Sequence, residues 1–500
     1  MTTAPTDDRP LGSTAGPAFE AAKAVVHGHR LPSVHARPAL AFSTTYLRGG
    51  PTGGPSAAEP VCDPEAGPLH RAAVEIASGR LSAREVVEEA LSAVSARNNE
   101  LVGLVEVLAE QAVAEAARCD AERKRGSIRG VLHAVPLTVK DIIDVAGVPT
   151  RAGSDAYFEI PSGDAAAVAR LRSAGAIFVG KAATHEFALG VTSPQSHNPH
   201  DPSRIPGGSS GGSAISVATG MALGSLGTDT RASIRVPAAL SGVVGLKPTF
   251  GRVPTTGVVS LSWSMDHVAP MATTVGDAAL LLDVLDPTGS CGRPFTAALA
   301  LPVTDLRVGV PEAAFTGCQT GVTRTVAAAL QAASELGCRV DNVVRPDDAD
   351  LELANAAGLV VSRCEAATIH RSFSLDRSRY WQEVAEQLAA AEAIPAIDYL
   401  QAQRARLALA EGLVGLFRHC DVLAMPTVPV VAPPRDDFAA HLMTLSRNAI
   451  PWSFVGFPAI SLPCGRVDGL PVGLQLVAAP YREDLLISLG RALEVALAGS

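Results

Sequence analysis

The chain has 500 residues, 47% hydrophobic and 18% charged, which is enough apolar material for a large core. Its formal charge of −9, with no basic tract, argues against a nucleic-acid partner. The first residues (MTTAPTDDRPLGS) lack an apolar signal segment, and no long apolar run follows, so we expect a cytoplasmic protein without a membrane-spanning helix.

The chain divides into a short extension and one large domain. Residues 1–65 are rich in Pro, Gly, Thr and His, which predicts a partly ordered extension with one helix near residues 18–29. Helical periodicity starts at Pro68, where we expect the domain of residues 66–500 to begin. Ser82 followed by Glu85 predicts a capping box, and another helix is expected over Ala109–Lys124.

Beyond these helices, short strand-like segments alternate with helical ones, the pattern of an α/β fold. The predicted strands include AIFVGK, LRVGVP, CRVDNV and DVLAMPTVPVV, and two more strands near the C-terminus precede a final helix over residues 482–497. The uncharged, mostly small residues 214–226 are expected to form a helix that packs closely against its neighbours. Eight cysteines without a C-x-x-C pair indicate reduced thiols, and we expect neither a metal nor a cofactor.

Two loops rich in Gly and Ser carry the chemistry: residues 207–213 (GGSSGGS) and residues 227–233 (GTDTRAS). A serine hydroxyl attacks at neutral pH only when a base takes its proton, and neither loop has a histidine. The natural candidate is Lys140 in the apolar segment VPLTVKD, because burial lowers the pKa of a lysine and lets it act as a base. The loop around Ser233 is also suited to present backbone N–H groups to a developing oxyanion.

These segments resemble the amidase signature family, the Ser–cisSer–Lys hydrolases. The resemblance rests on PGGSSGGSA, GTDT, GVVGLKPT and the surrounding segments VPLTVKDIIDVAGVPTRAGS, GKAATHEFALG, FPAISLPCG and GLPVGLQLVAAPYRED, over about residues 68–497. It implies a single α/β domain with a central twisted mixed sheet surrounded by helices. It also implies an amidase that cleaves a linear C–N amide bond of a small molecule. The charge and the lack of a long apolar run predict neither a nucleic-acid nor a membrane partner, and a homodimer is left open.

Carried over to this chain, the resemblance makes Ser233 the nucleophile, Ser209 the bridging serine after a cis peptide bond, and Lys140 the base. The oxyanion hole and the supporting residues follow from the same resemblance. The oxyanion hole would consist of the backbone N–H groups of Thr230, Arg231, Ala232 and Ser233, and the supporting residues would be Ser210, Asp229 and Arg235.

One departure is notable: Arg231 and Ala232 stand where the family usually has two glycines. One hypothesis is that Arg231 binds an anionic group of the substrate, such as a carboxylate, because a guanidinium suits that role. Other readings stay open: a site adapted to an unusual acyl group or impaired, acyl transfer to an amine or alcohol, a glutaminase subunit of a tRNA amidotransferase, or a non-catalytic binding subunit.

The same residues also have simpler interpretations. Residues 207–211 also match the G-x-S-x-G elbow of α/β-hydrolases, but the late histidines stand in poor contexts for a triad. Taken alone, Lys140 would be assigned to a salt bridge with Asp141. His185-Glu186 lacks the second histidine of a zinc motif, and Asp266-His267 is expected to have a packing role.

Overall fold

The computed structural model describes residues 15–29, 60, 62–290 and 292–498. Its centre is an 11-stranded mixed sheet in the order β1-β3-β2-β4-β6-β5-β10-β11-β9-β7-β8. The strands are β1 Leu104–Val107, β2 Pro136–Lys140, β3 Ile177–Ala182, β4 Gly224–Asp229, β5 Val244–Lys247, β6 His267–Ala272, β7 Arg307–Pro311, β8 Arg339–Val343, β9 Val422–Pro426, β10 Ala459–Val467 and β11 Leu470–Ala478. The expected α/β fold with a mixed sheet is therefore confirmed.

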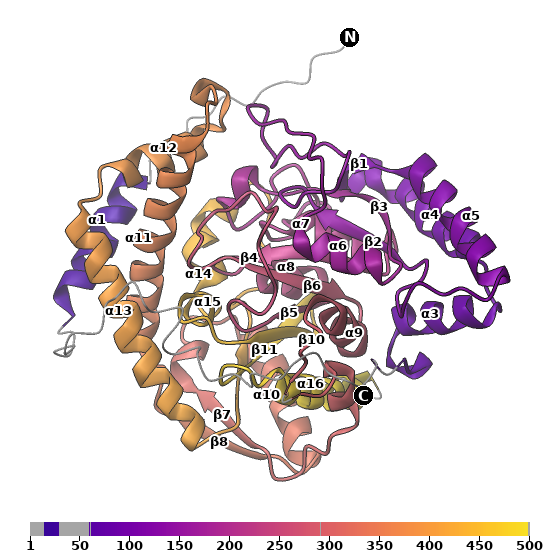
Figure 1. Ribbon diagram of the computed structural model, residues 1–500. Helices are drawn as coiled ribbons and strands as arrows, with labels where there is room; N and C mark the ends of the chain where they lie inside the picture. Colours follow the sequence, from indigo (N-terminus) through magenta and orange to yellow (C-terminus); the bar gives the residue numbers. More distant parts are fainter. Residues whose placement is uncertain (1–14, 30–59, 61, 291, 499–500) are drawn as a thin grey trace.

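Helices surround this sheet (Figure 1). They are α1 Ala15–Gly28, α3 Pro68–Ser78, α4 Ala83–Leu101, α5 Ala109–Lys124, α6 Ala166–Ser173, α7 Gly211–Ala218, α8 Arg235–Ser241, α9 Val275–Leu285, α10 Thr320–Glu335, α11 Asp348–Ser372, α12 Gln382–Glu392, α13 Ala396–Val414, α14 Leu442–Ser446, α15 Ile450–Phe454 and α16 Glu483–Ala498. Short 3-10 turns cover Pro64–Ala66, Glu186–Ala188, Phe295–Ala300, Glu312–Phe315, Arg377–Arg379, Gly415–Arg418 and Phe438–His441.

Strand β6 shows how the two faces of the sheet are filled. Ala269 and Met271 pack with residues of α7 and α8, whereas Val268 and Ala272 belong to the larger core that includes α9. Successive side chains of a strand point to opposite faces, so α7 and α8 cover one face and α9 the other. Parallel pairing of β2 with β3 and β4 places the carboxyl ends of β2 and β4, and the residues that follow them, at one edge of the sheet.

Two local predictions can be compared directly with the structure. The capping box at Ser82 is confirmed, since its Oγ accepts from the Glu85 N–H and the Glu85 carboxylate accepts from the Ser82 N–H. The helix predicted over residues 214–226 is wrong in its second half. Helix α7 ends at Ala218, Gly220 has φ of +72°, and Gly224 begins the buried strand β4.

Helix α1 packs against α11, α12 and α13 at the edge of the molecule (Figure 1). Its buried residues Phe19, Ala22 and Val26 repeat every three or four positions, which places them on one face of the helix. Near the end of the helix, His27 Nε2 lies 2.8 Å from the Asp398 carboxylate of α13. Much of the predicted extension, residues 1–14, 30–59 and 61, lies outside the described residues.

None of the helices in the described part of the chain combines the length and the apolar character needed to cross a bilayer.

Candidate active site

Lys140, the last residue of β2, is fully buried and makes two hydrogen bonds. Its Nζ lies 2.7 Å from Ser209 Oγ and 2.8 Å from Thr228 Oγ1. Burial lowers the pKa of Lys140 from its ordinary 10.5 to about 7, although the carboxylates of Asp266 and Asp229 act in the opposite direction. A large share of this amine is therefore neutral near pH 7, as a base requires.

Backbone contacts hold Ser209 in place. The Gly208–Ser209 peptide bond is cis, and the Ser209 carbonyl accepts from Ser193 Oγ at 3.1 Å and from the His185 N–H at 3.3 Å. Gly208 has no room for a side chain, because an added Cβ would lie 2.4 Å from the carbonyl carbon of Thr192. The glycine thus lets the loop approach the neighbouring backbone closely enough to bring Ser209 to the lysine.

Ser233 follows β4 and precedes α8, and 7% of its surface is exposed. Ser210 joins its loop to that of Ser209: the Ser210 N–H donates to the Ser233 carbonyl at 3.3 Å. Ser210 Oγ also donates to the Thr228 carbonyl at 3.1 Å and accepts from the Thr228 N–H at 3.3 Å. The two serine loops, 24 residues apart at Ser209 and Ser233, therefore form one hydrogen-bonded unit.

The turn before Ser233 contains a run of unpaired backbone N–H groups. Four consecutive N–H groups have no acceptor among the described residues, those of Thr230, Arg231, Ala232 and Ser233. The next N–H, of Ile234, donates to the Asp229 carboxylate at 3.2 Å. Since buried backbone N–H groups are rarely left without a partner, this run is suited to bind a negatively charged oxygen.

A buried ion pair fixes this turn. The Arg235 guanidinium donates to both carboxylate oxygens of Asp229, at 3.0 and 3.1 Å, and both side chains are inaccessible to solvent. Burial alone would raise the pKa of Asp229, but the adjacent Arg235 outweighs it and holds that pKa below its ordinary range. Arg235 also donates to the Ala449 carbonyl and to Gln475 Oε1, each at 2.8 Å, and Ser453 Oγ donates to Asp229 at 2.7 Å.

Asp266 also contacts this turn, a role that the sequence did not indicate. Its carboxylate accepts from the Thr230 hydroxyl at 2.6 Å, from Ser260 Oγ at 2.7 Å, and from the N–H groups of Leu261 and Ser262. Burial nevertheless raises the pKa of Asp266. Sequence reasoning also gave Thr228 no role, although it lies in the second serine loop, and it missed Ser193, Ser453 and Gln475, which have no motif of their own and meet the serine loops only in the folded chain.

The structure contradicts the simpler interpretation of Lys140 and gives the His185-Glu186 dipeptide ordinary protein contacts. Asp141 does not pair with Lys140; it lies 3.0 Å from Lys181 Nζ. His185 and Glu186 have separate partners, since His185 Nε2 lies 2.6 Å from the Glu383 carboxylate whereas Glu186 accepts from Ser154 and from the Trp381 N–H. A metal bound by both side chains of this dipeptide would have to displace these contacts.

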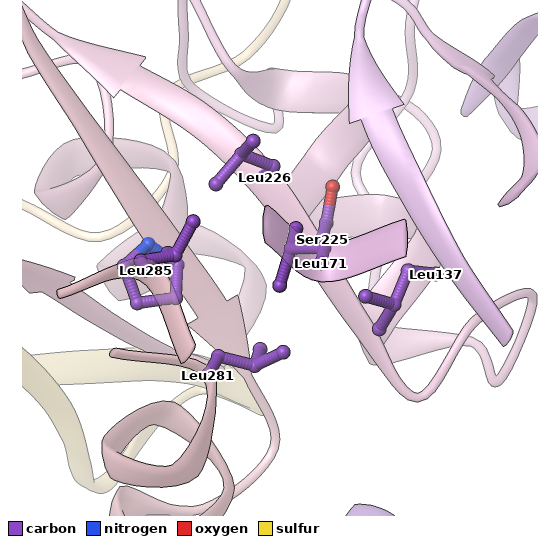
Figure 2. Close-up of a pocket in the computed structure, with 7 residues that line it drawn as sticks. Leu137, Leu171, Ser225, Leu226, Leu281 and Leu285 are labelled. Carbon is purple, nitrogen blue, oxygen red and sulfur yellow. The ribbon is translucent and has the colours of Figure 1, made fainter. Parts of the chain in front are cut away.

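A small apolar cavity is lined in part by residues of β2 and β4, the strands that carry Lys140 and Asp229 (Figure 2). It is lined by Leu137, Leu171, Ser225, Leu226, Pro270, Leu281 and Leu285. Leu137 and Leu226 precede Lys140 and Asp229 by three residues, about 10 Å along each strand. Its one polar side chain, Ser225, donates to the Thr138 carbonyl at 3.3 Å, so the cavity offers no reactive group and is a packing gap rather than a substrate site.

Comparison of the sequence with known protein families identifies the family to which this site belongs. The family model described as "Amidase" matches residues 85–487, which is most of the chain and includes both serine loops and Lys140. The chain belongs to the amidase family. It is an amidase-signature enzyme of the hydrolases that act on C–N bonds.

Individual relatives are matched over nearly their whole length. The chain is 39% identical to a glutamyl-tRNA(Gln) amidotransferase subunit of Anaeromyxobacter sp. (strain K), over 85% of this chain and 95% of the relative. It is 37% identical to a 1-carboxybiuret hydrolase subunit of Pseudomonas sp. (strain ADP), over 84% and 96%. A solved amidase crystal structure aligns with a TM-score of 0.79 at 36% identity, covering 86% of this chain and 99% of that one.

Proposed function

We propose that this amidase hydrolyses a linear C–N amide bond of a small molecule through an acyl-enzyme on Ser233. The observation that carries the proposal is the buried Lys140 amine, 2.7 Å from Ser209 Oγ, on a loop that Ser210 joins to Ser233. A solvated lysine with a pKa near 10.5 would be protonated at neutral pH, whereas burial lowers the pKa of Lys140 to about 7. Lys140, Ser209 and Ser233 then act as base, relay and nucleophile.

The proton path follows from the two hydrogen bonds of Lys140. A neutral amine has two N–H bonds and one lone pair, so it donates to Thr228 and accepts the Ser209 proton. Ser209 in turn takes the proton of Ser233 as Ser233 Oγ attacks the amide carbon. The resulting oxyanion binds to the unpaired N–H groups that begin at Thr230.

Collapse of the tetrahedral intermediate releases ammonia or an amine, which receives the proton from Lys140 through Ser209. Water then attacks the ester on Ser233, and the same relay takes its proton and returns it to the Ser233 oxygen as the carboxylic acid leaves. Asp229, fixed by Arg235, and Ser210 hold the turn in position without exchanging protons with the substrate. We further propose a cytoplasmic enzyme whose catalytic domain is residues 66–500.

The test is covalent labelling of the purified chain with a fluorophosphonate, followed by peptide mass spectrometry. We expect the label on Ser233, none in Ser233→Ala, and strongly reduced labelling in Lys140→Ala and Ser209→Ala. Ser213→Ala is the matched control, because Ser213 lies in the first turn of α7, four residues after Ser209, and its buried Oγ has no partner among the described residues. Labelling of Ser233→Ala as strong as that of the native chain would contradict the proposal, and an unlabelled native chain would favour a non-catalytic role.

Two alternatives use the same acyl-enzyme. One relative is named as part of a glutamyl-tRNA(Gln) amidotransferase, which makes glutamine a candidate amide donor for this chain also. Release of glutamate and ammonia only when partner proteins are added would favour that role over an independent amidase. Acyl transfer would show itself as a new amide or ester when an amine or alcohol is added to the reaction.

A further inference from the structure

Arg231 is half-buried, and two of its three guanidinium nitrogens are buried with unused hydrogen-bonding capacity. Its Nε and Nη2 atoms are shielded from solvent and have no hydrogen-bond partner in the described part of the chain. Shielding charged N–H groups from water without giving them a hydrogen-bond partner is unfavourable. Such an arrangement persists where a ligand supplies the missing partner.

A second guanidinium, that of Arg363 on α11, lies close enough to influence Arg231. Burial, and secondly the positive charge of Arg363, lower the pKa of Arg231 to about 9. Arg363 is itself held by neutral acceptors, since its Nε donates to Gln387 Oε1 at 2.8 Å and its Nη2 to the Leu189 carbonyl at 3.4 Å. Burial lowers the pKa of Arg363 to about 10, although the Glu383 carboxylate acts in the opposite direction, so both arginines remain positively charged at neutral pH.

The position of Arg231 along the chain ties this pair to the reacting centre. Arg231 precedes Ser233 by two residues, at most about 7 Å between Cα atoms. Its own N–H belongs to the unpaired run of donors, and its carbonyl accepts from Arg235 Nη2 at 3.2 Å. The backbone of Arg231 is thus fixed beside the site while part of its guanidinium lacks a partner among the described residues.

We propose that Arg231 and Arg363 together bind a carboxylate of the substrate, so that the preferred substrates are short amides that also carry a carboxylate. Two guanidiniums are suited to one carboxylate because each presents planar N–H groups that match its two oxygens. The carboxylate satisfies the buried donors of Arg231 and offsets the repulsion between the two cations. This inference rests on the proposed amidase function, since it names the substrate class of the same site.

The test compares acid amides with neutral amides of equal length: malonamate with propionamide, succinamate with butyramide, and glutaramate with valeramide. For the best-fitting length we expect the native enzyme to prefer the acid amide by about 100-fold in kcat/KM, since a charged hydrogen bond contributes roughly 1.5–3 kcal/mol. Arg231→Gln and Arg363→Gln should each lower this preference ratio at least about tenfold. Arg371→Gln, an exposed arginine of α11, is the matched control and should keep the ratio.

Binding without turnover separates this inference from the proposed function. The Ser233→Ala variant and the double variant Ser233→Ala/Arg231→Gln are each titrated calorimetrically with every acid amide and with its neutral partner. We expect binding of an acid amide that Arg231→Gln weakens at least about tenfold. Hydrolysis through Ser233 with an unchanged ratio in Arg231→Gln would overturn the carboxylate site and leave the amidase function standing. Failure of every acid amide to bind Ser233→Ala would also overturn it.

Discussion

The lowered pKa of Lys140 makes a quantitative prediction for the pH dependence of hydrolysis. The difference between 10.5 and about 7 corresponds to about 5 kcal/mol in favour of the neutral amine. With a pKa near 7 the neutral fraction is about one half at pH 7, about 9% at pH 6 and about 1% at pH 5. The sign is that of a base: kcat/KM should rise with pH and level off above about pH 8.

The assay is ammonia release from a slowly hydrolysed amide between pH 5 and 9, reported as kcat/KM so that it reflects the free enzyme. Asp266→Asn provides the internal test, because its carboxylate raises the pKa of Lys140. Its removal should move the acid limb to lower pH, on the order of one unit. Glu159→Gln, which removes an exposed carboxylate, should leave the limb in place.

Two results would refute this reasoning. A profile that is flat between pH 5 and 8, or one that begins to rise only near pH 10, would mean that Lys140 is not the titrating base. Loss of the limb in Asp266→Asn, rather than a shift, would assign the titration to Asp266 itself, whose pKa burial also raises.

Three further predictions concern stability. Arg235→Met should lower the free energy of unfolding by about 3–5 kcal/mol in urea titrations, because it leaves the Asp229 carboxylate buried without its cation, and Asp229→Asn in the same chain should recover part of this loss. Gly208→Ala should lower the melting temperature and the labelling of the site, because its Cβ would meet backbone at 2.4 Å, whereas Gly163→Ala, with open space around it, should do neither. Phe19→Ala should speed hydrogen exchange in α1, because removing this buried ring costs about 3–5 kcal/mol of packing free energy between the helix and its neighbours. Unchanged exchange in α1 would contradict the packing of Phe19.

The sequence predicted elements whose signals are local. Helix α5 has the predicted bounds Ala109–Lys124, and the capping box at Ser82 forms as expected. The failure at residues 214–226 has a physical reason. Strand β4 is buried on both faces and built from small residues, so it lacks the alternation that distinguishes a half-buried strand from a helix.

The same contrast holds for the candidate site. The Gly- and Ser-rich loops and Lys140 could be singled out because each has a recognisable local pattern. The supporting contacts could not: Ser453 of α15 and Gln475 of β11 lie more than 200 residues beyond Asp229 and Arg235 and approach them only in the folded chain. Arg363 was missed for the same reason, since an arginine within a long helix gives no sign of what it faces.

The contacts of Arg235 have a consequence for biogenesis. This side chain, two residues after Ser233, is fastened to a carbonyl at position 449, a hydroxyl at 453 and an amide at 475, all in the last eighth of the polypeptide. During synthesis, the turn that carries the reactive hydroxyl completes its support only when that terminal portion emerges from the ribosome and joins the sheet. A chain truncated ahead of Gln475 would hold its serine and lysine motifs intact and still lack one of the anchors that orient them.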